Sequence, residues 1–437
     1  MIKLKSISTF LVAVLLLASC NPPKEEGADS PKEIETLNPE EAGFNRDSLA
    51  RIDEMVTKYV DKGFIPGAVV LIARHGKIVY ESAVGWNSID GQTSVGTNDQ
   101  FRIASMTKPM VSTAIMQLYE QGKLDLQDPL SKYIPEFANP QVLTNFNAGD
   151  TTWEGRPAKR EVTVHQLLTH TSGIPYGFTH PWFGAMYAKA GVPDGANYLD
   201  MALEEKMAIL GEMPLLFEPG EEWFYGLSTD VLGRVVEVAS GQELDVFVRE
   251  NITEPLGMAD TDFFFADSSQ RLVSLYVPLG DTAIMEMKHT EGAPFSPDFP
   301  FRGAKKYLSG GSGLSSTARD YFVFCQTILD GGKWGDVRIL NETTVSAMTA
   351  NQIDTISFGG NKFGYGFAVQ MNDGEDGRQR RIGRLSWSGI FHTTFWIDPN
   401  RDVIAIMMSQ VFSNPNKGQI DVGFETLVNG ALIDEEL

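Results

Sequence analysis

The segment FRIASMTKP, residues 101–109, decides how this chain is interpreted. Within it, Ser105 and Lys108 stand three residues apart at the start of a predicted helix that ends at Gly122, so both side chains fall on one helix face. A serine hydroxyl is a weak nucleophile at neutral pH and needs a neighbouring base. A lysine can be that base where burial or a helix N-terminus disfavours its charged form. The pattern S-x-x-K occurs once in the chain, but it is short, and an N-cap serine beside a surface lysine remains the alternative.

Strand-like patterns lie on both sides of this segment, near the two ends of the chain. Residues 68–73 and 78–83 are rich in β-branched and aromatic side chains and flank His75-Gly76, which predicts a hairpin. Similar runs return at 367–371, 393–397 and 403–408, and helical patterns occupy 52–59, 230–240 and 421–432. The middle, residues 125–300, is mostly helical and loop-like. The pattern predicts an α/β fold with one sheet made from both chain ends and a mostly helical inserted region.

The N-terminus has the layout of an export signal. Lys3 and Lys5 precede an apolar stretch, residues 10–17, that is too short to span a bilayer. It ends in LASC, which resembles the bacterial lipobox and implies lipidation at Cys20. A cleaved signal with an incidental cysteine is the alternative. We expect a signal peptide at 1–20, a flexible tether at 21–40 that is rich in Pro, Glu and Lys, and a globular domain at 41–437. The protein would be exported and held as a lipoprotein facing the periplasm or cell surface, with the lipid as its contact with a membrane.

Composition excludes several classes of function. The net charge of −21 makes nucleic acid an improbable partner. Two cysteines are too few for a disulfide framework, and Cys325 lies in an apolar helical run, which predicts a small buried side chain. His165, His170 and His180 lack the H-E-x-x-H spacing of a zinc site, so no metal is expected, and no cofactor is expected either. The Gly-rich residues 310–313 lack the lysine of a P-loop and are interpreted as a flexible turn.

Several further segments share an order that is typical of one superfamily. They are VTVHQLLTHTSGIP (162–175), FEPGEEWFYGLSTDVLG (217–233), YLSGGSGLSSTARD (307–320) and LSWSGIFHTTFWIDP (385–399). Together with Ser105 and Lys108 they resemble the serine β-lactamase-like superfamily, which includes class C β-lactamases, D-alanyl-D-alanine carboxypeptidases, penicillin-binding proteins and family VIII carboxylesterases. The resemblance runs from about Gly43 to the C-terminus. It implies the β-lactamase/transpeptidase-like fold, in which an antiparallel sheet is flanked by helices.

The resemblance also implies roles for particular residues. Ser105 would be the nucleophile and Lys108 its partner, and Tyr225 matches the tyrosine of a Y-x-N motif as the general base. Trp387-Ser388-Gly389 stands where the family has K-T-G or H-x-G. The oxyanion hole would use the backbone N–H groups of Ser105 and Ile390. His170 would belong to a structural loop. Apart from the resemblance, His392 is close to Gly389 in the sequence and is a candidate to line the cleft or to assist the reaction, with a structural position as the alternative.

Two departures from the family pattern indicate the subclass. The second motif reads Tyr225-Gly226-Leu227, so the side-chain amide that binds an acylamino group is replaced by Leu227. We expect Leu227 to contact substrate, together with Trp387, Ser388 and Gly389. The third has Trp387 in place of the cation that holds a substrate carboxylate; losing such a charged hydrogen bond weakens binding by about 1.5–3 kcal/mol. Trp387 offers apolar surface instead, as in family VIII carboxylesterases. We expect a serine hydrolase that acts on small or apolar esters. Two alternatives stay open. One is a class C-like β-lactamase or a D-Ala-D-Ala or D-amino-acid peptidase acting on cell-wall fragments, and the other is a non-catalytic surface-binding lipoprotein.

Overall fold

The computed structural model describes residues 32–197, 200–266, 271–291, 295–372 and 381–433. The predicted signal peptide and Cys20 lie outside these residues. The predicted tether lies partly inside them, and the folded region begins earlier than expected. Ile78 donates its backbone N–H to Glu35 and accepts the N–H of Leu37, so residues before position 40 are already paired with the hairpin.

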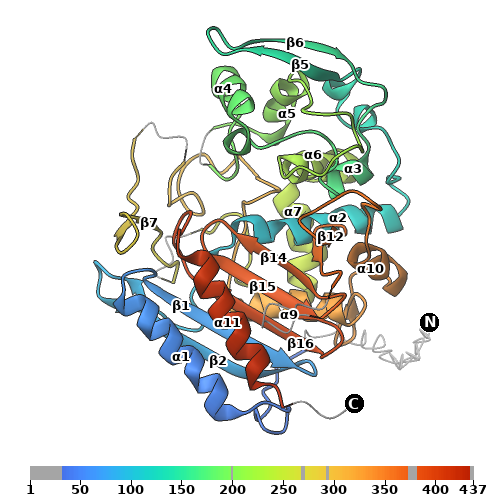
Figure 1. Ribbon diagram of the computed structural model, residues 1–437. Helices are drawn as coiled ribbons and strands as arrows, with labels where there is room; N and C mark the ends of the chain where they lie inside the picture. Colours follow the sequence, from blue (N-terminus) through green and yellow to red (C-terminus); the bar gives the residue numbers. More distant parts are fainter. Residues whose placement is uncertain (1–31, 198–199, 267–270, 292–294, 373–380, 434–437) are drawn as a thin grey trace, which may run out of the picture. The chain divides into compact units, whose positions relative to one another are not determined.

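One eight-stranded antiparallel sheet joins the two ends of the folded region (Figure 1). Its strand order is β12-β13-β14-β15-β16-β1-β2-β3. The strands are β1 (Gly67–Arg74), β2 (Lys77–Ser88), β3 (Thr93–Ser94), β12 (Lys362–Phe363), β13 (Ala368–Val369), β14 (Leu385–Gly389), β15 (Thr393–Asp398) and β16 (Val403–Met408). The predicted sheet from both chain ends is therefore confirmed, although the strand expected at 367–371 has only two residues.

The central strands are buried on both faces, which is why they are apolar without interruption. In β1, Val69 and Leu71 point into one hydrophobic core, and Val70 and Ile72 point into the other. Successive side chains of a strand face opposite sides of a sheet, so a sheet covered on both sides needs apolar residues at every position. The central sheet thus lies between two layers.

Helices form those two layers (Figure 1). Helices α1 (Arg46–Asp61) and α11 (Lys417–Ala431) pack together over one face, and α9 (Ala318–Leu329) contacts β1 and β16 from the other. Asn45 is the N-cap residue of α1: its side chain accepts the N–H of Ser48 and caps the first turn. In α9, Cys325 is fully buried, as predicted.

The inserted region is helical, as expected, but it also contains two hairpins that the sequence did not predict. Helix α2 (Thr107–Glu120) precedes this region, and its own helices are α3 (Val164–Leu168), α4 (Pro181–Ala190), α5 (Leu203–Gly211), α6 (Ser228–Ser240), α7 (Leu244–Val248) and α8 (Glu254–Leu256). The hairpins pair β5 (Gln141–Asn147) with β6 (Thr152–Pro157) and β7 (Tyr276–Pro278) with β8 (Ile284–Glu286). Most side chains of β5 and β6 are exposed or half-buried, so they lack a strong apolar alternation.

The remaining short elements connect the inserted region to the sheet. They are β4 (Phe101–Arg102), which pairs with β9 (Ser315–Ser316), β10 (Lys333–Trp334), which pairs with β11 (Val337–Arg338), and α10 (Glu342–Thr349). Within the described ranges, every helix is too short or too polar to cross a bilayer.

Candidate active site

Ser105 lies in a short 3-10 turn, η1 (Ala104–Met106), directly before α2. The residue before it, Ala104, is buried and has a φ of +45°, a left-handed conformation that is unfavourable for a side chain with a Cβ. Such conformations persist where the surrounding structure enforces them, and they cluster at functional sites. The turn presents Ser105 at the N-terminal end of α2, as the S-x-x-K pattern predicted.

Lys108 lies on the first turn of α2 and is 1% exposed. Its Nζ donates to the Oγ of Ser105 at 3.1 Å, to the hydroxyl of Tyr176 at 2.9 Å and to the carbonyl oxygen of Gly311 at 2.8 Å. A lysine ammonium has three protons, so these three acceptors satisfy it completely. Lys108 therefore has one fixed position beside Ser105, and the surface-lysine alternative is wrong.

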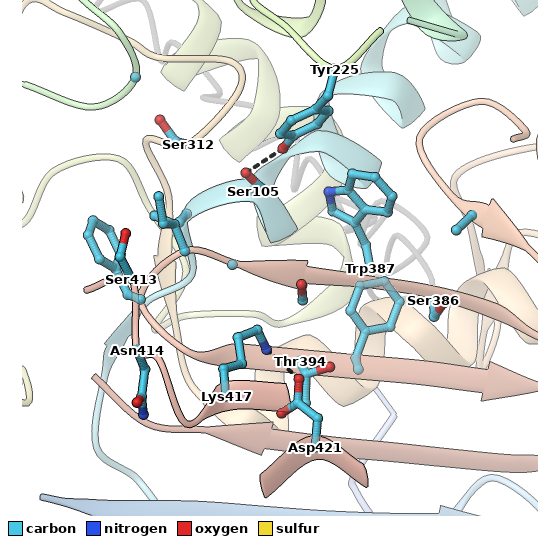
Figure 2. A pocket seen from close by; sticks show the side chains of 18 of the residues that line it. Ser105, Tyr225, Ser312, Ser386, Trp387, Thr394, Ser413, Asn414, Lys417 and Asp421 are labelled. Carbon is cyan, nitrogen blue, oxygen red and sulfur yellow. Dashed lines mark hydrogen bonds and ion pairs between the residues drawn. The ribbon is translucent and has the colours of Figure 1, made fainter. Parts of the chain in front are cut away.

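Tyr225 completes the group from the segment that precedes α6. Its hydroxyl donates to the Oγ of Ser105 at 2.6 Å (Figure 2). A Cβ on Gly226 would lie 1.9 Å from the carbonyl oxygen of Ile174, so a glycine is required for this close approach of two backbones. The predicted residues Ser105, Lys108 and Tyr225 are thus brought together.

Tyr176 belongs to the same group, and the sequence reasoning missed it. Its ring lies 5.2 Å from that of Tyr225, and its hydroxyl accepts from Lys108. Burial raises the pKa of Tyr176 well above its ordinary value, and the neighbouring Tyr225 and Asp230 act in the same direction. Tyr176 therefore remains a neutral phenol. Its signal was its place directly after the segment ending in Ile174-Pro175, but position alone did not separate it from a core aromatic residue.

The Gly-rich residues 310–313 are not the flexible turn that the sequence suggested. They are buried, and Gly311 holds Lys108 through its carbonyl oxygen. A Cβ on Gly311 would lie 2.5 Å from an oxygen of Asp230 and 2.8 Å from the hydroxyl of Tyr176. The glycine is there because three segments meet at this point and leave no space for a side chain.

Strand β14 carries Trp387, Ser388 and Gly389 to the same place, and Ile390 follows at its end. A Cβ on Gly389 would lie 2.5 Å from the carbonyl oxygen of Ile103, which shows how closely β14 approaches the segment before Ser105. These four residues line one cavity together with Ser105. Their predicted roles, including an oxyanion hole at the N–H groups of Ser105 and Ile390, are compatible with this placement.

The cavity has a volume of about 1300 Å³. Aromatic side chains form one wall beside the nucleophile: the Trp387 ring lies 5.5 Å from that of Tyr225, and the Trp223 ring lies 4.1 Å from that of Phe358. Figure 2 shows Trp387 beside Ser105 and Tyr225, with Thr394 and Asp421 among the polar residues farther along the cavity. The chamber next to Ser105 is therefore mainly apolar.

Leu227, which we expected to contact substrate, does not line this cavity. It is fully buried in the hydrophobic core, where it precedes α6 and faces away from the opening. The replacement of an amide by a leucine thus makes the second motif part of the core and leaves Tyr225 as the residue of that motif that reaches the cavity.

The histidines have structural positions. His392 is fully buried between Asn414 and Asp421, so it does not line the cleft. His170 packs 5.0 Å from the ring of Tyr225, and burial holds the pKa of His170 well below its ordinary value, with the charge of Lys108 adding to the effect. In the part of the chain that is described, no group of three or more His, Cys, Asp or Glu side chains is arranged to hold a metal ion.

Taken together, the geometry provides a nucleophilic oxygen with two proton-carrying partners. The Oγ of Ser105 receives hydrogen bonds from Lys108 and Tyr225, so both partners lie within reach of its proton, and whichever of them is unprotonated can take that proton as Oγ attacks a carbonyl carbon. The arrangement suits acyl transfer through a covalent intermediate.

Known proteins with the same organisation include esterases. A family model named Beta-lactamase matches residues 52–428. Esterase EstB of Burkholderia gladioli is 29% identical over 405 residues, which are 90% of this chain and 98% of that protein. A protein of Escherichia coli K12, provisionally named a D-alanyl-D-alanine carboxypeptidase, is 28% identical over 435 residues, 93% of this chain and 91% of that protein.

Among solved structures, EstCE1, described as a hydrolase with promiscuous acyltransferase activity, superposes with a TM-score of 0.75. It is 28% identical, and the match covers 87% of this chain and 99% of that chain. The predicted superfamily and fold are confirmed by these matches. The chain is an enzyme of the serine hydrolase class, and it belongs to the β-lactamase family.

Proposed function

We propose that this chain is a carboxylesterase that hydrolyses esters with an apolar acyl or alcohol group by way of an acyl-enzyme on Ser105. The observation that carries the proposal is the aromatic wall beside the nucleophile. Trp387 stands there in place of a cation, and Trp223 and Phe358 extend the apolar surface. Such a wall stabilises an apolar group by burial and offers nothing to a carboxylate.

The reaction proceeds in two displacements. The Oγ of Ser105 bonds to the ester carbonyl carbon while its proton passes to the Lys108–Tyr225 pair, and the N–H groups of Ser105 and Ile390 stabilise the oxyanion. Collapse expels the alcohol, which takes the proton from the pair. Water then attacks the acyl-enzyme and gives its proton to the same pair. Collapse of this second intermediate breaks the bond to Oγ, the pair returns the proton to Ser105, and the carboxylic acid is released.

The test compares the unchanged chain with Ser105→Ala on p-nitrophenyl butyrate and on a chromogenic cephalosporin. We expect ester turnover that falls by about 10³-fold or more in Ser105→Ala, with little cleavage of the cephalosporin. Ser386→Ala is the matched control, since Ser386 lines the same cavity without any hydrogen bond to Ser105. Its turnover is expected to stay within about twofold of the unchanged chain.

Other outcomes select the alternatives. Cleavage of the cephalosporin without ester turnover would indicate a β-lactamase, and turnover of neither would leave a D-amino-acid peptidase or a binding protein. Mass spectrometry for acylated Ser105 would separate the last two, since a binding protein forms no covalent intermediate.

Acyl transfer to an alcohol is a second candidate. The cavity, at about 1300 Å³, exceeds the roughly 300–1000 Å³ of a typical small-molecule site, and an acceptor alcohol would fit beside the acyl group. EstCE1 is described as having acyltransferase activity. Chromatography of reactions with p-nitrophenyl butyrate and excess butanol tests this: butyl butyrate formed at a rate dependent on Ser105 would support transfer, and butyric acid alone would contradict it.

We propose in addition that the protein is an exported lipoprotein anchored at Cys20. The basis is the basic-then-apolar layout of residues 1–20 and its LASC ending. Cys20→Ser is expected to move the protein from the detergent phase to the aqueous phase in Triton X-114 partitioning. Cys325→Ala, which changes the other cysteine, is the control and should leave the partitioning unaltered. Equal partitioning of the unchanged chain and Cys20→Ser would contradict the anchor.

A further inference from the structure

A buried ion pair lies behind the candidate active site, outside the residues that face the cavity. Lys206 of α5 and Asp230 of α6 are both 0% exposed, and their Nζ and Oδ1 atoms are 3.5 Å apart. Burying two charges costs free energy even when they are paired. No step of the proposed reaction uses either residue, so the pair needs another explanation.

Asp230 is connected to Lys108 through the Gly-rich segment. Its Oδ1 accepts a 2.8 Å hydrogen bond from Ser309, which anchors residues 309–313. Its Oδ2 has no hydrogen-bond partner among the described residues and lies against Gly311, 2.5 Å from where a Cβ would be. The carbonyl oxygen of that same glycine accepts from Lys108. The carboxylate therefore lies beneath the group that holds Lys108 in place.

Lys206 contacts Asp230 through Oδ1, the oxygen that also accepts from Ser309. Its ammonium also contacts the hydroxyl of Tyr307, which is in turn 3.4 Å from Asp230. The positive charge of Lys108 lowers the pKa of Lys206, after the larger effect of burial, while Asp230 raises it. Lys206 is therefore attracted by Asp230 and repelled by Lys108.

Other titratable groups surround Lys108 from three further segments. His170 and Tyr176 are neutral, because the pKa of His170 lies well below and that of Tyr176 well above the ordinary value. Tyr225 is the partner of Ser105. Asp194, whose pKa is raised by burial, also faces Lys206 and Asp230. Removing Lys206 or Asp230 therefore changes the charge near Lys108 without touching Ser105 or the cavity.

We propose that Lys206 and Asp230 are a positioning pair for the nucleophile. Asp230 holds the segment whose Gly311 carbonyl receives Lys108. Lys206 neutralises the negative charge of Asp230. Without Lys206, that charge would favour the protonated form of the Lys108–Tyr225 pair. The inference rests on the proposed function, because it assumes that this pair takes the proton of Ser105. It makes the ion pair the feature that sets the lower pH limit of the reaction.

The test measures the pH dependence of the rate at which a fluorophosphonate labels Ser105, alongside kcat and KM on p-nitrophenyl butyrate. Lys206→Met leaves the carboxylate uncompensated and is expected to move the midpoint of the acidic limb upward by about one pH unit. Asp230→Asn keeps an acceptor for Ser309, removes the negative charge, and should move the midpoint downward. KM should stay within about twofold, because neither residue reaches the cavity.

The double variant Lys206→Met/Asp230→Asn keeps the proposal testable if Lys206→Met does not fold. It restores charge balance, so its midpoint should return to within about 0.3 pH units of the unchanged chain. If Lys206 and Asp230 had only a structural role, both single variants would lose activity at every pH, and the midpoint of the acidic limb would not move in opposite directions. The inference would be overturned if the midpoints of the two single variants moved in the same direction or did not move. It would also be overturned if the midpoint of the double variant did not return to that of the unchanged chain. Failure of the unchanged chain to react with the fluorophosphonate would overturn the proposed function as well.

Discussion

The hydroxyl of Tyr225 donates a 2.6 Å hydrogen bond to the Oγ of Ser105, although the two residues are 120 positions apart in the sequence. Lys108 donates to the same oxygen at 3.1 Å. The oxygen therefore has two proton-carrying partners, and either one can take its proton once it has lost its own. This relationship makes the S-x-x-K pattern a reactive arrangement and leads to the first prediction.

Tyr225→Phe should lower kcat/KM on p-nitrophenyl butyrate by about 10²–10⁴-fold, the contribution typical of a positioned general acid or base. KM should change little, because the ring that contacts substrate remains. Steady-state kinetics check this. Tyr119→Phe, which removes the hydroxyl of a tyrosine that is 41% exposed, is the control and should have no effect. Full activity in Tyr225→Phe would leave Lys108 as the sole base.

Gly311→Ala should destabilise the protein and slow the labelling of Ser105. The added Cβ would lie 2.5 Å from Asp230 and 2.8 Å from the hydroxyl of Tyr176, so the segment that holds Lys108 must shift. Overpacking of this kind costs about 1–3 kcal/mol. Urea unfolding and fluorophosphonate labelling measure both effects. In the control Gly430→Ala the new Cβ meets open space, so the free energy of unfolding should stay equal or rise. Unaltered stability and labelling in Gly311→Ala would show that the segment adapts.

Trp387→Ala should reduce the preference for longer acyl chains. Trp387 packs against Tyr225 and Phe363 and forms part of the apolar wall. The ratio of kcat/KM for p-nitrophenyl octanoate to kcat/KM for p-nitrophenyl acetate should fall by about tenfold. This is the effect expected when a few methylene groups of the substrate lose their apolar contacts. Trp182→Ala, at an exposed tryptophan outside the cavity, should keep the ratio. An unchanged ratio in Trp387→Ala would place the acyl group elsewhere.

The free energy of unfolding should depend on pH because the carboxyl of Asp320 is buried. Burial raises its pKa to about 6 from 3.8, against hydrogen bonds from Thr261 and Asp260 that act in the other direction. Below pH 3.8 both the folded and the unfolded chain carry the proton. As pH rises from about 4 to 6, the unfolded chain ionises first, so the free energy of unfolding falls by about 3 kcal/mol, and above pH 6 the loss is constant.

Asp320→Asn lacks this ionisation. Its free energy of unfolding relative to the unchanged chain should therefore increase between pH 4 and 6.5, as urea titrations at each pH would show. Asp47→Asn, at an exposed position of α1, is the control and should show no comparable change over this range. A flat difference for Asp320→Asn would mean that the buried carboxyl stays ionised throughout.

Much of the fold could be predicted because its signals are local. The strands β1, β15 and β16 are short, mostly apolar runs, and the helix α1 has apolar residues at helical spacing. The β5–β6 hairpin could not be predicted, since its side chains are largely exposed and its pairing depends on contacts outside the segment. The tether was predicted to extend to residue 40, although Glu35 and Leu37 already pair with Ile78. This pairing also depends on contacts outside the segment.

The sequence by itself determined the chemistry of the nucleophile and the architecture that carries it. Ser105 and Lys108 meet because a helix places residues three apart on one face, and the apolar runs at both chain ends determine a sheet that is buried on both faces. These are short-range relationships. They follow from the geometry of a helix and a strand, whatever surrounds them.

Only the tertiary structure decided which distant residues complete the site. Tyr176 and Gly311 accept the hydrogen bonds of Lys108, while Leu227, two residues from Tyr225, turns into the core. The Gly-rich segment is buried because Asp230 and Tyr176 close around it. Such choices depend on how α2, α6 and β14 pack together, and close packing is a property of all three segments at once rather than of any one of them.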